Sequence, residues 1–534
     1  MNTQQDDILI GIDAGTSLIK CVAFSVVGEL LAVASTPNEY TTVSDNCAEQ
    51  DMQLTRSIVL QTLTDLVSKL GSEAKRVKAV SLTGQGDGMW LINRAGEPVQ
   101  KAWLWLDSRA ASLVTELENS ADYARLFELT GTAINASQNR IQMLWLERTD
   151  PQTLDLADCS FHCKDYLYFC LTGVRATDPG EALFTYGDIK KHQYSPEVLS
   201  ILGLSHRADT LPDIVDGLTT SSPMLKDICE QVGLPSDTQV NLAAVDVICS
   251  ALGGGLYDQG TQTAMTLLGT TGIHMRYSSA SSELTLPKDK TGYTIVFPGG
   301  GHAQLQTNMS ATMNIDWLLD LIADAVSLTG NTIDREALLM QLDQYVQETP
   351  LGNAIYQPYI STAGERGPFF DANARAGFIG LDQHTDIKDL ARCVYEGICL
   401  AARDCYDDLG ELPTEIRLSG GGAKSSALRH ILASVMNRPV RSIDREESGA
   451  AGAAMMAAVQ LGHYDSIDSC VQTWVAPHLG TAIEPNTDHT DAYNELFTIY
   501  KAHRKSQTST WESLANLRQS SSCISKTAEQ GDSH

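Results

Sequence analysis

The sequence predicts an α/β protein with two related domains that face each other across a ligand cleft. The chain of 534 residues is too long for one hydrophobic core, so two large domains are expected. Apolar β-forming runs are interleaved with segments of helical periodicity, as in α/β proteins. In addition, a glycine-containing hairpin near the start of the chain recurs half a chain later.

The first hairpin spans residues 8–24. A run of β-forming residues leads to Asp13, a turn follows at Gly15, Thr16 and Ser17, and the chain returns apolar and β-rich. Such a turn directs several N–H groups and two hydroxyls to one point, which suits an anion, and Asp13 would face a metal ion carried by that anion. An ordinary edge hairpin with a capped turn would give the same local pattern.

The second hairpin, residues 265–276, favours the phosphate-binding interpretation. Gly269, Thr270, Thr271 and Ile273 repeat the order of the glycine, the two hydroxyl residues and the isoleucine of the first hairpin. Two matching hairpins indicate duplicated domains, each offering a phosphate loop to one nucleotide. We expect an N-terminal domain at 1–257, a C-terminal domain at 258–480, and a C-terminal helix with a disordered tail at 481–534.

Composition and charge exclude several classes of protein. The chain is 43% apolar and 19% charged, as globular proteins are. A net charge of −28 repels nucleic acid and anionic membranes, so neither is expected as a partner. No signal peptide or long apolar run is present, which predicts a cytoplasmic protein with its twelve cysteines reduced. The trio Cys159, His162 and Cys163 has ligand-like spacing, but without a second pair nearby we do not predict zinc.

A strand at 77–83, preceded by an amphipathic helix at 48–70, delivers the sequence GQGDGMW to a strand end, where open α/β sheets bind ligands. This glycine cluster does not fit the dinucleotide-binding pattern. Gln85 and Asp87 are instead predicted to form hydrogen bonds with a ligand.

Residues 101–111 are predicted to form the next strand, which carries Trp105, Asp107 and Arg109. Aromatic rings beside a fixed carboxylate and guanidinium make a surface that binds C–H faces and hydroxyls of a sugar-like ligand. The alternative is a core strand in which Asp107 and Arg109 cap the following helix.

Asp246 is the one charged residue in the apolar segment 240–256, which is predicted to be a strand. A charge in such a place is costly unless it is used or paired. Its position about twenty residues before the second hairpin would place it beside the γ-phosphate of a nucleotide. The alternative is that Asp246 caps a helix.

The second half contains a strand, glycine turn and helix at 295–322, a loop-rich insertion at 359–381 and a long helix at 390–409. Residues 415–436 pass from a strand through three glycines into a helix, but Ala423 and Leu418 exclude a Walker A motif. Bare backbone at the glycines would let a flat ring or ribose lie close to a helix N-terminus. The small-residue segment 446–462 is predicted to be a tightly packed helix.

Six motifs together resemble the FGGY family of carbohydrate kinases: GIDAGTSLIK, WLWLDSRA, GTTG, GERGPFFDANARAGFIGL, YEG and LSGGGAKS. The resemblance covers roughly residues 8–480. It implies two actin-like, ribonuclease H-type domains that close over ATP and a sugar or polyol, with Mg²⁺ as the metal.

Roles for individual residues follow from the same resemblance. It implies that Asp246 is the catalytic base, and that Asp13 and Asp246 face Mg²⁺ through water and ATP. The implied nucleotide-binding residues are Asp13, Gly15, Thr16, Ser17, Lys20, Gly269, Thr270, Thr271, Gly421, Gly422 and Lys424. The implied substrate-binding residues are Gln85, Asp87, Trp105, Asp107, Arg109 and Asp246.

Within the family, GQGDGMWL and WLWLDSRA are similar to the motifs of erythritol-type polyol kinases. The expected reaction is transfer of phosphate from ATP to a primary hydroxyl of a small polyol, with erythritol favoured. A ketopentose such as L-xylulose, L-ribulose or D-xylulose is the alternative substrate. A third hypothesis is a non-enzymatic actin-like ATP-binding protein. Association into a homodimer is left open.

Overall fold

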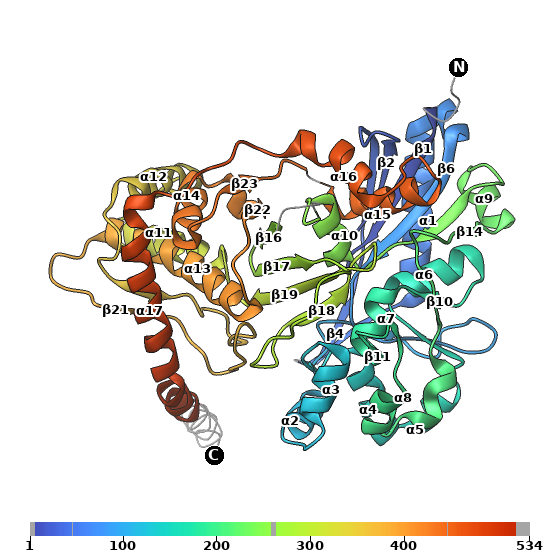
Figure 1. Ribbon diagram of the computed structural model, residues 1–534, viewed down its shortest axis with the longest axis horizontal. Helices are drawn as coiled ribbons and strands as arrows, with labels where there is room; N and C mark the ends of the chain where they lie inside the picture. Colours follow the sequence, from blue (N-terminus) through green and yellow to red (C-terminus); the bar gives the residue numbers. More distant parts are fainter. Residues whose placement is uncertain (1–5, 45, 258–262, 446, 519–534) are drawn as a thin grey trace, which may run out of the picture.

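The computed structural model describes residues 6–44, 46–257, 263–445 and 447–518. Two six-stranded sheets, one in each half of the chain, organise the fold (Figure 1). The first sheet has the order β14 (Ser222–Pro223), β15 (Gln239–Leu242), β6 (Val77–Gly84), β1 (Ile8–Ala14), β2 (Leu18–Ser25) and β3 (Leu30–Pro37). The second has the order β18 (Tyr293–Val296), β19 (His302–Asn308), β17 (Gly272–Ser278), β16 (Thr263–Leu268), β22 (Glu415–Ser419) and β23 (Val440–Ser442).

The two sheets repeat one topology. β1 pairs antiparallel with β2 and parallel with β6, and β16 pairs in the same way with β17 and β22. The antiparallel neighbours β3 and β19 and the parallel neighbours β15 and β23 extend the match. The duplication predicted from the two hairpins is therefore confirmed, with each hairpin turn at the same place in its sheet.

Seventeen α-helices are present in the described ranges. In the first half they are α1 (Met52–Leu70), α2 (Ala111–Glu118), α3 (Tyr123–Thr130), α4 (Asn139–Thr149), α5 (Pro151–Asp155), α6 (Cys163–Thr172), α7 (Pro179–Tyr186), α8 (Pro196–Ile201), α9 (Lys226–Val232) and α10 (Asp246–Gly253). In the second half they are α11 (Met313–Ser327), α12 (Arg335–Glu348), α13 (Ile387–Leu409), α14 (Ser426–Met436), α15 (Ser448–Gln460), α16 (Ile467–Trp474) and α17 (Thr490–Ser506). None of the helices in these ranges combines the length and the apolarity needed to cross a membrane.

Short strands pair outside the two large sheets. They are β4 (Thr41–Ser44), β5 (Cys47–Gln50) and β8 (Ala102–Trp103); β7 (Trp90–Ile92) and β9 (Cys159–Phe161); β10 (Ala176–Thr177) and β13 (Asp213–Ile214); β11 (Gly187–Asp188) and β12 (Gln193–Tyr194); and β20 (Ile355–Gln357) and β21 (Gly377–Ile379). Those of the first half, together with α2–α5, α7 and α8, form the part of this half that lies beneath its sheet (Figure 1), whereas β20 and β21 pair in the second half.

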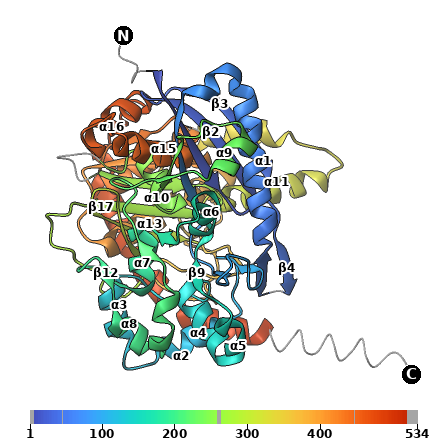
Figure 2. The ribbon, with the colours of Figure 1, turned by 90° about the vertical axis from the view of Figure 1, so that its right-hand side faces the viewer.

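A shared hydrophobic core lies between the two sheets. It joins Leu9 and Val22 of the first sheet to Met265 and Met275 of the second through the helices α10 and α15. On the opposite face of the first sheet, α1, α6 and α9 build a separate core. Figure 2 shows α1 and α15 on opposite sides of β2. α15 comes from the second half of the chain but packs on β1 and β6 of the first sheet. The sheets alone therefore do not define the domains, and the domain boundary predicted at 257/258 stays a prediction.

Three predicted segments differ from the structure. The strand predicted at 101–111 ends at Trp103 and the chain turns into α2, while the strand predicted at 240–256 ends at Leu242 and continues as α10. An additional strand, β19, lies between the glycine turn and the helix predicted within 295–322. The first two segments are apolar runs, and periodicity alone does not separate a buried strand from a buried helix. The tail predicted to be disordered from Ser520 lies outside the described residues.

We expect Gly11→Ala to destabilise the protein, because β1 and α15 touch at this glycine. A Cβ at Gly11 would lie 2.0 Å from the carbonyl oxygen of Ala450, so strand and helix would have to separate. Overpacking of this kind costs roughly 1–3 kcal/mol, and we expect a loss of several degrees in the melting temperature. Gly377→Ala is the matched control, since a Cβ there meets no atom within 4 Å. Equal melting temperatures for both variants would contradict this packing.

Candidate active site

The first hairpin presents Asp13 at the end of β1. The turn is closed by the Gly15 N–H, which donates to the Leu18 carbonyl oxygen at 3.1 Å, and Ser17 is exposed at the tip. Burial raises the pKa of Asp13 to about 6, against the pull of Lys20 and with a further contribution from Glu447. Asp13 therefore has no cation that fully compensates its charge.

Lys20 lies on β2, and its ammonium is paired with a carboxylate instead of being free to bind a ligand. Its ammonium forms an ion pair with Glu447 at 2.9 Å, directly before α15. One residue into α15, a Cβ at Gly449 would lie 2.6 Å from Asp13 Oδ2 and 3.3 Å from Ser250 Oγ. The start of α15 thus joins the first hairpin to α10. Sequence reasoning missed Glu447 and Gly449, although the run of small residues at 448–454 indicated a close approach of backbones.

The second hairpin lies against the three glycines that follow β22. Its turn is held by the Gly269 N–H, which donates to Thr271 O at 3.0 Å, and by Ala311 N–H, which donates to Thr270 O at 2.8 Å. A Cβ at Gly420 would lie 2.6 Å from the carbonyl oxygen of Leu268, the last residue of β16. The structure therefore brings together the second hairpin and the glycine turn, the two segments that the family resemblance assigns to the nucleotide.

The glycine turn is packed on one side and open on the other. A Cβ at Gly422 would lie 2.7 Å from Leu268 Cβ, whereas one at Gly421 would meet no atom within 4 Å. Lys424 ends the short 3₁₀ helix η4 (Gly421–Lys424), and α14 follows from Ser426. A flat group can lie on the bare backbone at Gly421 next to the start of α14.

Asp246 is the first residue of α10, at the end of the connection from β15. Its Oδ1 accepts a hydrogen bond from the Val247 N–H at 2.6 Å. Burial raises its pKa to about 8, helped by repulsion from Asp13 and, more weakly, from Glu181 and Asp87, and opposed by the Val247 N–H. The strand predicted here was wrong, and the helix-start alternative describes the position better, with Val245 as the N-cap. A carboxylate of raised pKa beside Asp13 is suited to accepting a proton.

A chain of hydrogen bonds connects the first hairpin to the substrate-side motifs. Trp105 Nε1–H donates to Thr16 Oγ1 at 2.8 Å, and Thr16 Oγ1 donates to Gln85 Oε1 at 2.7 Å. Gln85 Nε2–H in turn donates to Gln50 Oε1 at 2.8 Å. The indole of Trp105 is 45% exposed, so it presents a ring face at the site while its N–H is fixed. Gln50 was not predicted, and nothing in its local sequence marks it.

The polar atoms of Asp107 and Arg109 are bound to each other and to neighbouring residues. The guanidinium of Arg109 donates to Asp107 Oδ2 at 2.8 Å and to Glu49 Oε1 at 2.9 Å, and Asp107 Oδ2 also accepts the Ala48 N–H at 2.9 Å. The Asp107 side chain is fully buried, and the Arg109 guanidinium stacks 3.8 Å above the ring of Trp103. The oxygens of Asp107 are therefore occupied, and Arg109 is held rigidly beside the exposed Trp105.

Asp87 sits in a strained turn and is bound from the other half of the chain. Its φ of 52° lies in the left-handed region, and such strain in a non-glycine residue clusters at functional sites. Asp87 Oδ2 accepts hydrogen bonds from Tyr293 Oη at 3.1 Å and Asn135 Nδ2 at 3.5 Å, while Oδ1 is buried without a hydrogen-bond partner. Burial raises the pKa of Asp87, against the pull of His162. Sequence reasoning missed Asn135 and Tyr293.

Comparison with protein families follows the same division of the chain. A model for the N-terminal domain of the FGGY family of carbohydrate kinases matches residues 8–253, and one for the C-terminal domain matches residues 264–461. The chain belongs to the FGGY family of carbohydrate kinases. As a member of this family it is an enzyme, a phosphotransferase.

Individual relatives support the FGGY assignment over nearly the whole chain. The erythritol kinase of Brucella abortus is 43% identical over 514 residues, covering 96% of this chain and 99% of that protein. The xylulose kinase of Bacillus subtilis is 26% identical over 505 residues, covering 92% and 96%. In structure, the gluconate kinase of Lactobacillus acidophilus superposes with a TM-score of 0.86 at 23% identity, covering 95% of this chain and 99% of that one. That likeness confirms the two-domain FGGY fold.

Proposed function

We propose that this FGGY kinase transfers the γ-phosphoryl group of Mg-ATP to a primary hydroxyl of a small polyol, with erythritol the favoured substrate. The observation that supports the substrate is the 43% identity to an erythritol kinase over 96% of the chain, against 26% to the xylulose kinase of Bacillus subtilis. The motifs around Gln85 and Trp105 agree with it, since they resemble those of polyol kinases. A ketopentose remains the second candidate because xylulose kinases match 92% of the chain.

Asp246 is the proposed general base. A primary hydroxyl is a weak nucleophile, so a carboxylate in hydrogen-bond reach must accept its proton as the oxygen attacks phosphorus. The Val247 N–H fixes Asp246 Oδ1, which leaves Oδ2 for the substrate hydroxyl. Burial and the neighbouring Asp13 bring the pKa of Asp246 to about 8, which makes it a far better proton acceptor than an ordinary carboxylate.

Magnesium fits the site because the chain leaves two acidic side chains there without full compensation. Burial raises the pKa of both carboxyls, Asp13 raises that of Asp246 further, and carboxylate oxygens are the ligands that Mg²⁺ prefers. The ion would neutralise negative charge on the phosphates. Asp13 and Asp246 would hold it through water and the nucleotide.

The two turns and the glycine segment fit a nucleotide. We propose that the N–H groups of residues 16, 17, 270 and 271 and the hydroxyls of Ser17, Thr270 and Thr271 bind phosphate oxygens, and that adenosine lies beside Gly421 and Gly422, where the backbone is open at Gly421. Lys424 would stand at the adenosine. Lys20, through its pair with Glu447, would hold the first hairpin against α15.

Release of ADP with Mg-ATP, measured across a panel of acceptors, tests the substrate. The panel contains erythritol, threitol, glycerol, xylitol, ribitol and the ketopentoses. We expect kcat/KM to be highest for erythritol. Highest turnover with a ketopentose would show that the substrate is a ketopentose, with the same mechanism. ADP release that no acceptor stimulates would favour an actin-like ATP-binding protein that is not a kinase.

The pH dependence of kcat/KM follows from the pKa of Asp246. Asp246 must be ionised in the free enzyme before it can accept the proton of the acceptor hydroxyl. We therefore expect kcat/KM to rise about tenfold per pH unit below pH 8 and to level off above it. The measurement uses subsaturating Mg-ATP and acceptor between pH 6 and 9. A profile that is flat over this range would contradict the raised pKa.

A further inference from the structure

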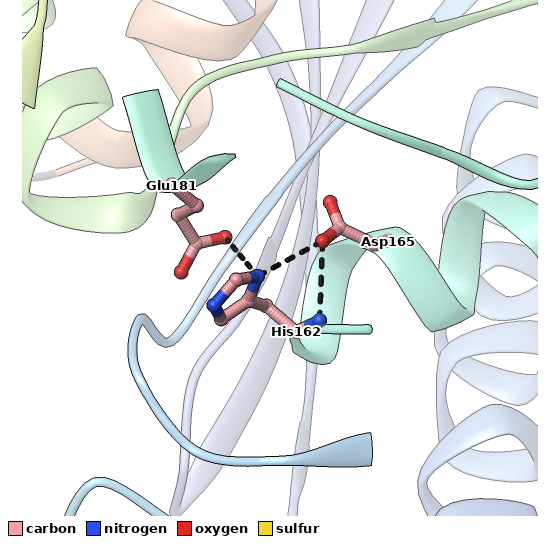
Figure 3. Close-up of side chains that lie close together, drawn as sticks. All are labelled: His162, Asp165 and Glu181. Atoms are coloured by element: carbon pink, nitrogen blue, oxygen red, sulfur yellow. Dashed lines mark hydrogen bonds and ion pairs between the residues drawn. The ribbon is translucent and has the colours of Figure 1, made fainter. Parts of the chain in front are cut away.

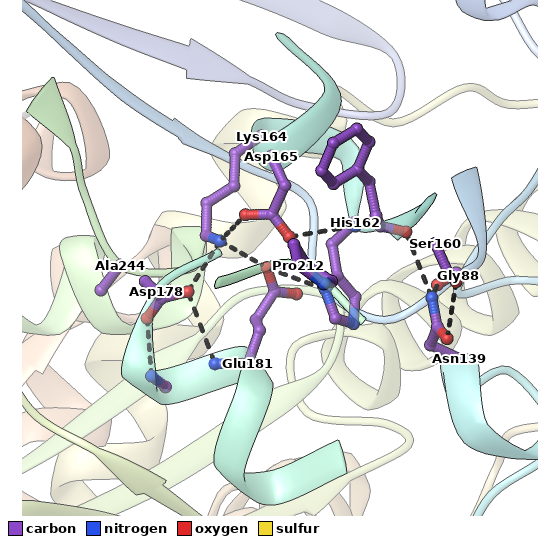
Figure 4. Close-up of polar contacts among 12 residues, drawn as sticks. Gly88, Asn139, Ser160, His162, Lys164, Asp165, Asp178, Glu181, Pro212 and Ala244 are labelled. Carbon is purple, nitrogen blue, oxygen red and sulfur yellow. Dashed lines mark hydrogen bonds and ion pairs between the residues drawn. The ribbon is translucent and has the colours of Figure 1, made fainter. Parts of the chain in front are cut away.

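A group of charged side chains lies buried behind the turn that carries Gln85 and Asp87. The ammonium of Lys164 contacts Asp165 Oδ1 at 2.6 Å, Asp178 Oδ1 at 2.7 Å and Glu181 Oε2 at 2.8 Å (Figure 4). His162 Nδ1 lies 3.1 Å from Asp165 Oδ2 and 3.7 Å from Glu181 Oε2 (Figure 3). All five side chains are almost completely buried.

We do not assign a metal ion to this group of side chains. His162, Asp165 and Glu181 offer ligand atoms within 4.8 Å of one another, as a metal site would. However, Lys164 already places a cation between the carboxylates. Burial works against its charge, but the three carboxylates outweigh burial and hold the pKa of Lys164 well above its ordinary value. The ammonium therefore occupies the place of a metal ion.

Two atoms of the group remain unused. His162 Nε2 and Glu181 Oε1 are buried and have no hydrogen-bond partner. In Figure 3 they point to the same side, away from Asp165. A buried polar atom without a partner is costly, so such atoms gathered in one place indicate a ligand or water that they bind.

The two unused atoms face the turn that carries Asp87. A Cβ at Gly86 would lie 3.4 Å from Glu181 Oε1 and 2.6 Å from Val245 Cγ2. Gly86 therefore lies between Glu181 and the residue that precedes Asp246. The charge of His162 is close enough to oppose the rise that burial causes in the pKa of Asp87. Asp87 Oδ1 is a further buried polar atom in this region without a hydrogen-bond partner.

We propose that Asp87, His162 and Glu181 form an inner polar wall that binds the hydroxyls of the acceptor farthest from the phosphorylated carbon. His162 Nε2–H donates a hydrogen bond to a hydroxyl oxygen, and Glu181 Oε1 and Asp87 Oδ1 accept hydrogen bonds from hydroxyl groups. One donor beside two acceptors matches a vicinal diol, since each hydroxyl both donates and accepts. The acceptor class is thus a polyol that carries a vicinal diol at the end away from the phosphorylated carbon. This inference rests on the proposed polyol kinase function.

The native enzyme gives the first test, because it needs no variant. Erythritol is compared with its 4-deoxy analogue, the erythro isomer of butane-1,2,3-triol, which lacks only the far hydroxyl. A site built to bind a hydroxyl rejects the analogue without it, so we expect kcat/KM for erythritol to exceed that for the analogue by a factor of at least 10². Equal values for the two acceptors would overturn the wall while leaving the kinase function intact. No turnover of any polyol would overturn the proposed function, and the wall with it.

A matched pair of variants assigns the effect to His162. Asparagine places its amide near the Nδ1 position and can still bind Asp165, whereas glutamine extends a donor toward the Nε2 position. His162→Asn should reduce the preference for erythritol over the 4-deoxy analogue at least tenfold, and His162→Gln should keep most of it. If His162→Asn lowered kcat/KM equally for both acceptors, His162 would act only through the fold and the proposal would be wrong.

Discussion

Replacement of Asp246 by asparagine should lower kcat by about 10²- to 10⁴-fold, the contribution that general-base catalysis typically makes. The amide keeps the size of the side chain and can still accept the Val247 N–H, but it cannot take a proton from the acceptor hydroxyl. Binding of Mg-ATP, measured by calorimetry, should persist because the two hairpins are untouched. Retention of kcat within tenfold of the native value would show that another group is the base.

The same variant has an effect on stability that is independent of catalysis. The pKa of Asp246 is raised from an ordinary 3.8 to about 8 in the folded protein, so folding takes up a proton between these pH values. Its contribution to stability is therefore full below pH 4 and is lost as pH rises through 8. Asp246→Asn should raise the melting temperature at pH 8 and have little effect at pH 4. The exposed Asp209→Asn is the control and should change neither.

Replacement of Lys164 by methionine should be the most destabilising change in the first half. It leaves Asp165, Asp178 and Glu181 buried without their shared ammonium. Removal of one partner from a buried ion pair costs roughly 3–5 kcal/mol, which corresponds to a large loss in melting temperature. The loss should be greater at pH 8 than at pH 5, since buried carboxylates can take up protons at the lower pH.

Lys191→Met is the matched control for Lys164→Met. Lys191 forms an ion pair with Asp188 at 2.8 Å, the distance of the pair between Lys164 and Glu181, but its side chain is 66% exposed. A surface pair contributes roughly 0–1 kcal/mol. Equal losses for the two variants, or a Lys164→Met loss that does not depend on pH, would contradict the role assigned to the buried ammonium.

The sequence predicted those parts of the site that lie on local motifs. The two hairpins repeat a short pattern, and each turn is closed by a hydrogen bond between near neighbours in the chain, so Asp13 and Gly269 could be placed without knowledge of the fold. Asp246 could be singled out because one charge in an apolar segment is unusual. Its secondary structure was predicted wrongly, since an apolar run fits a buried strand and a buried helix equally well.

The remaining parts depend on contacts between distant segments. Tyr293 reaches Asp87 across 206 positions of the chain, and Glu447 reaches Lys20 across 427. No local pattern carries such information. For the same reason the sequence showed His162 as part of a possible metal pattern with Cys159 and Cys163, whereas the fold places it against Asp165 and Glu181.

The most direct test of the central claim is the ³¹P NMR spectrum of the products from erythritol and Mg-ATP, recorded for the native enzyme and for Asp246→Asn. Erythritol phosphorylated on a primary hydroxyl gives a phosphomonoester signal split by the two protons of one CH₂ group. We predict this signal for the native enzyme and its near absence for the variant. Inorganic phosphate as the only product besides ADP from the native enzyme, or phosphoester formed equally fast by the variant, would contradict a polyol kinase that uses Asp246 as its base.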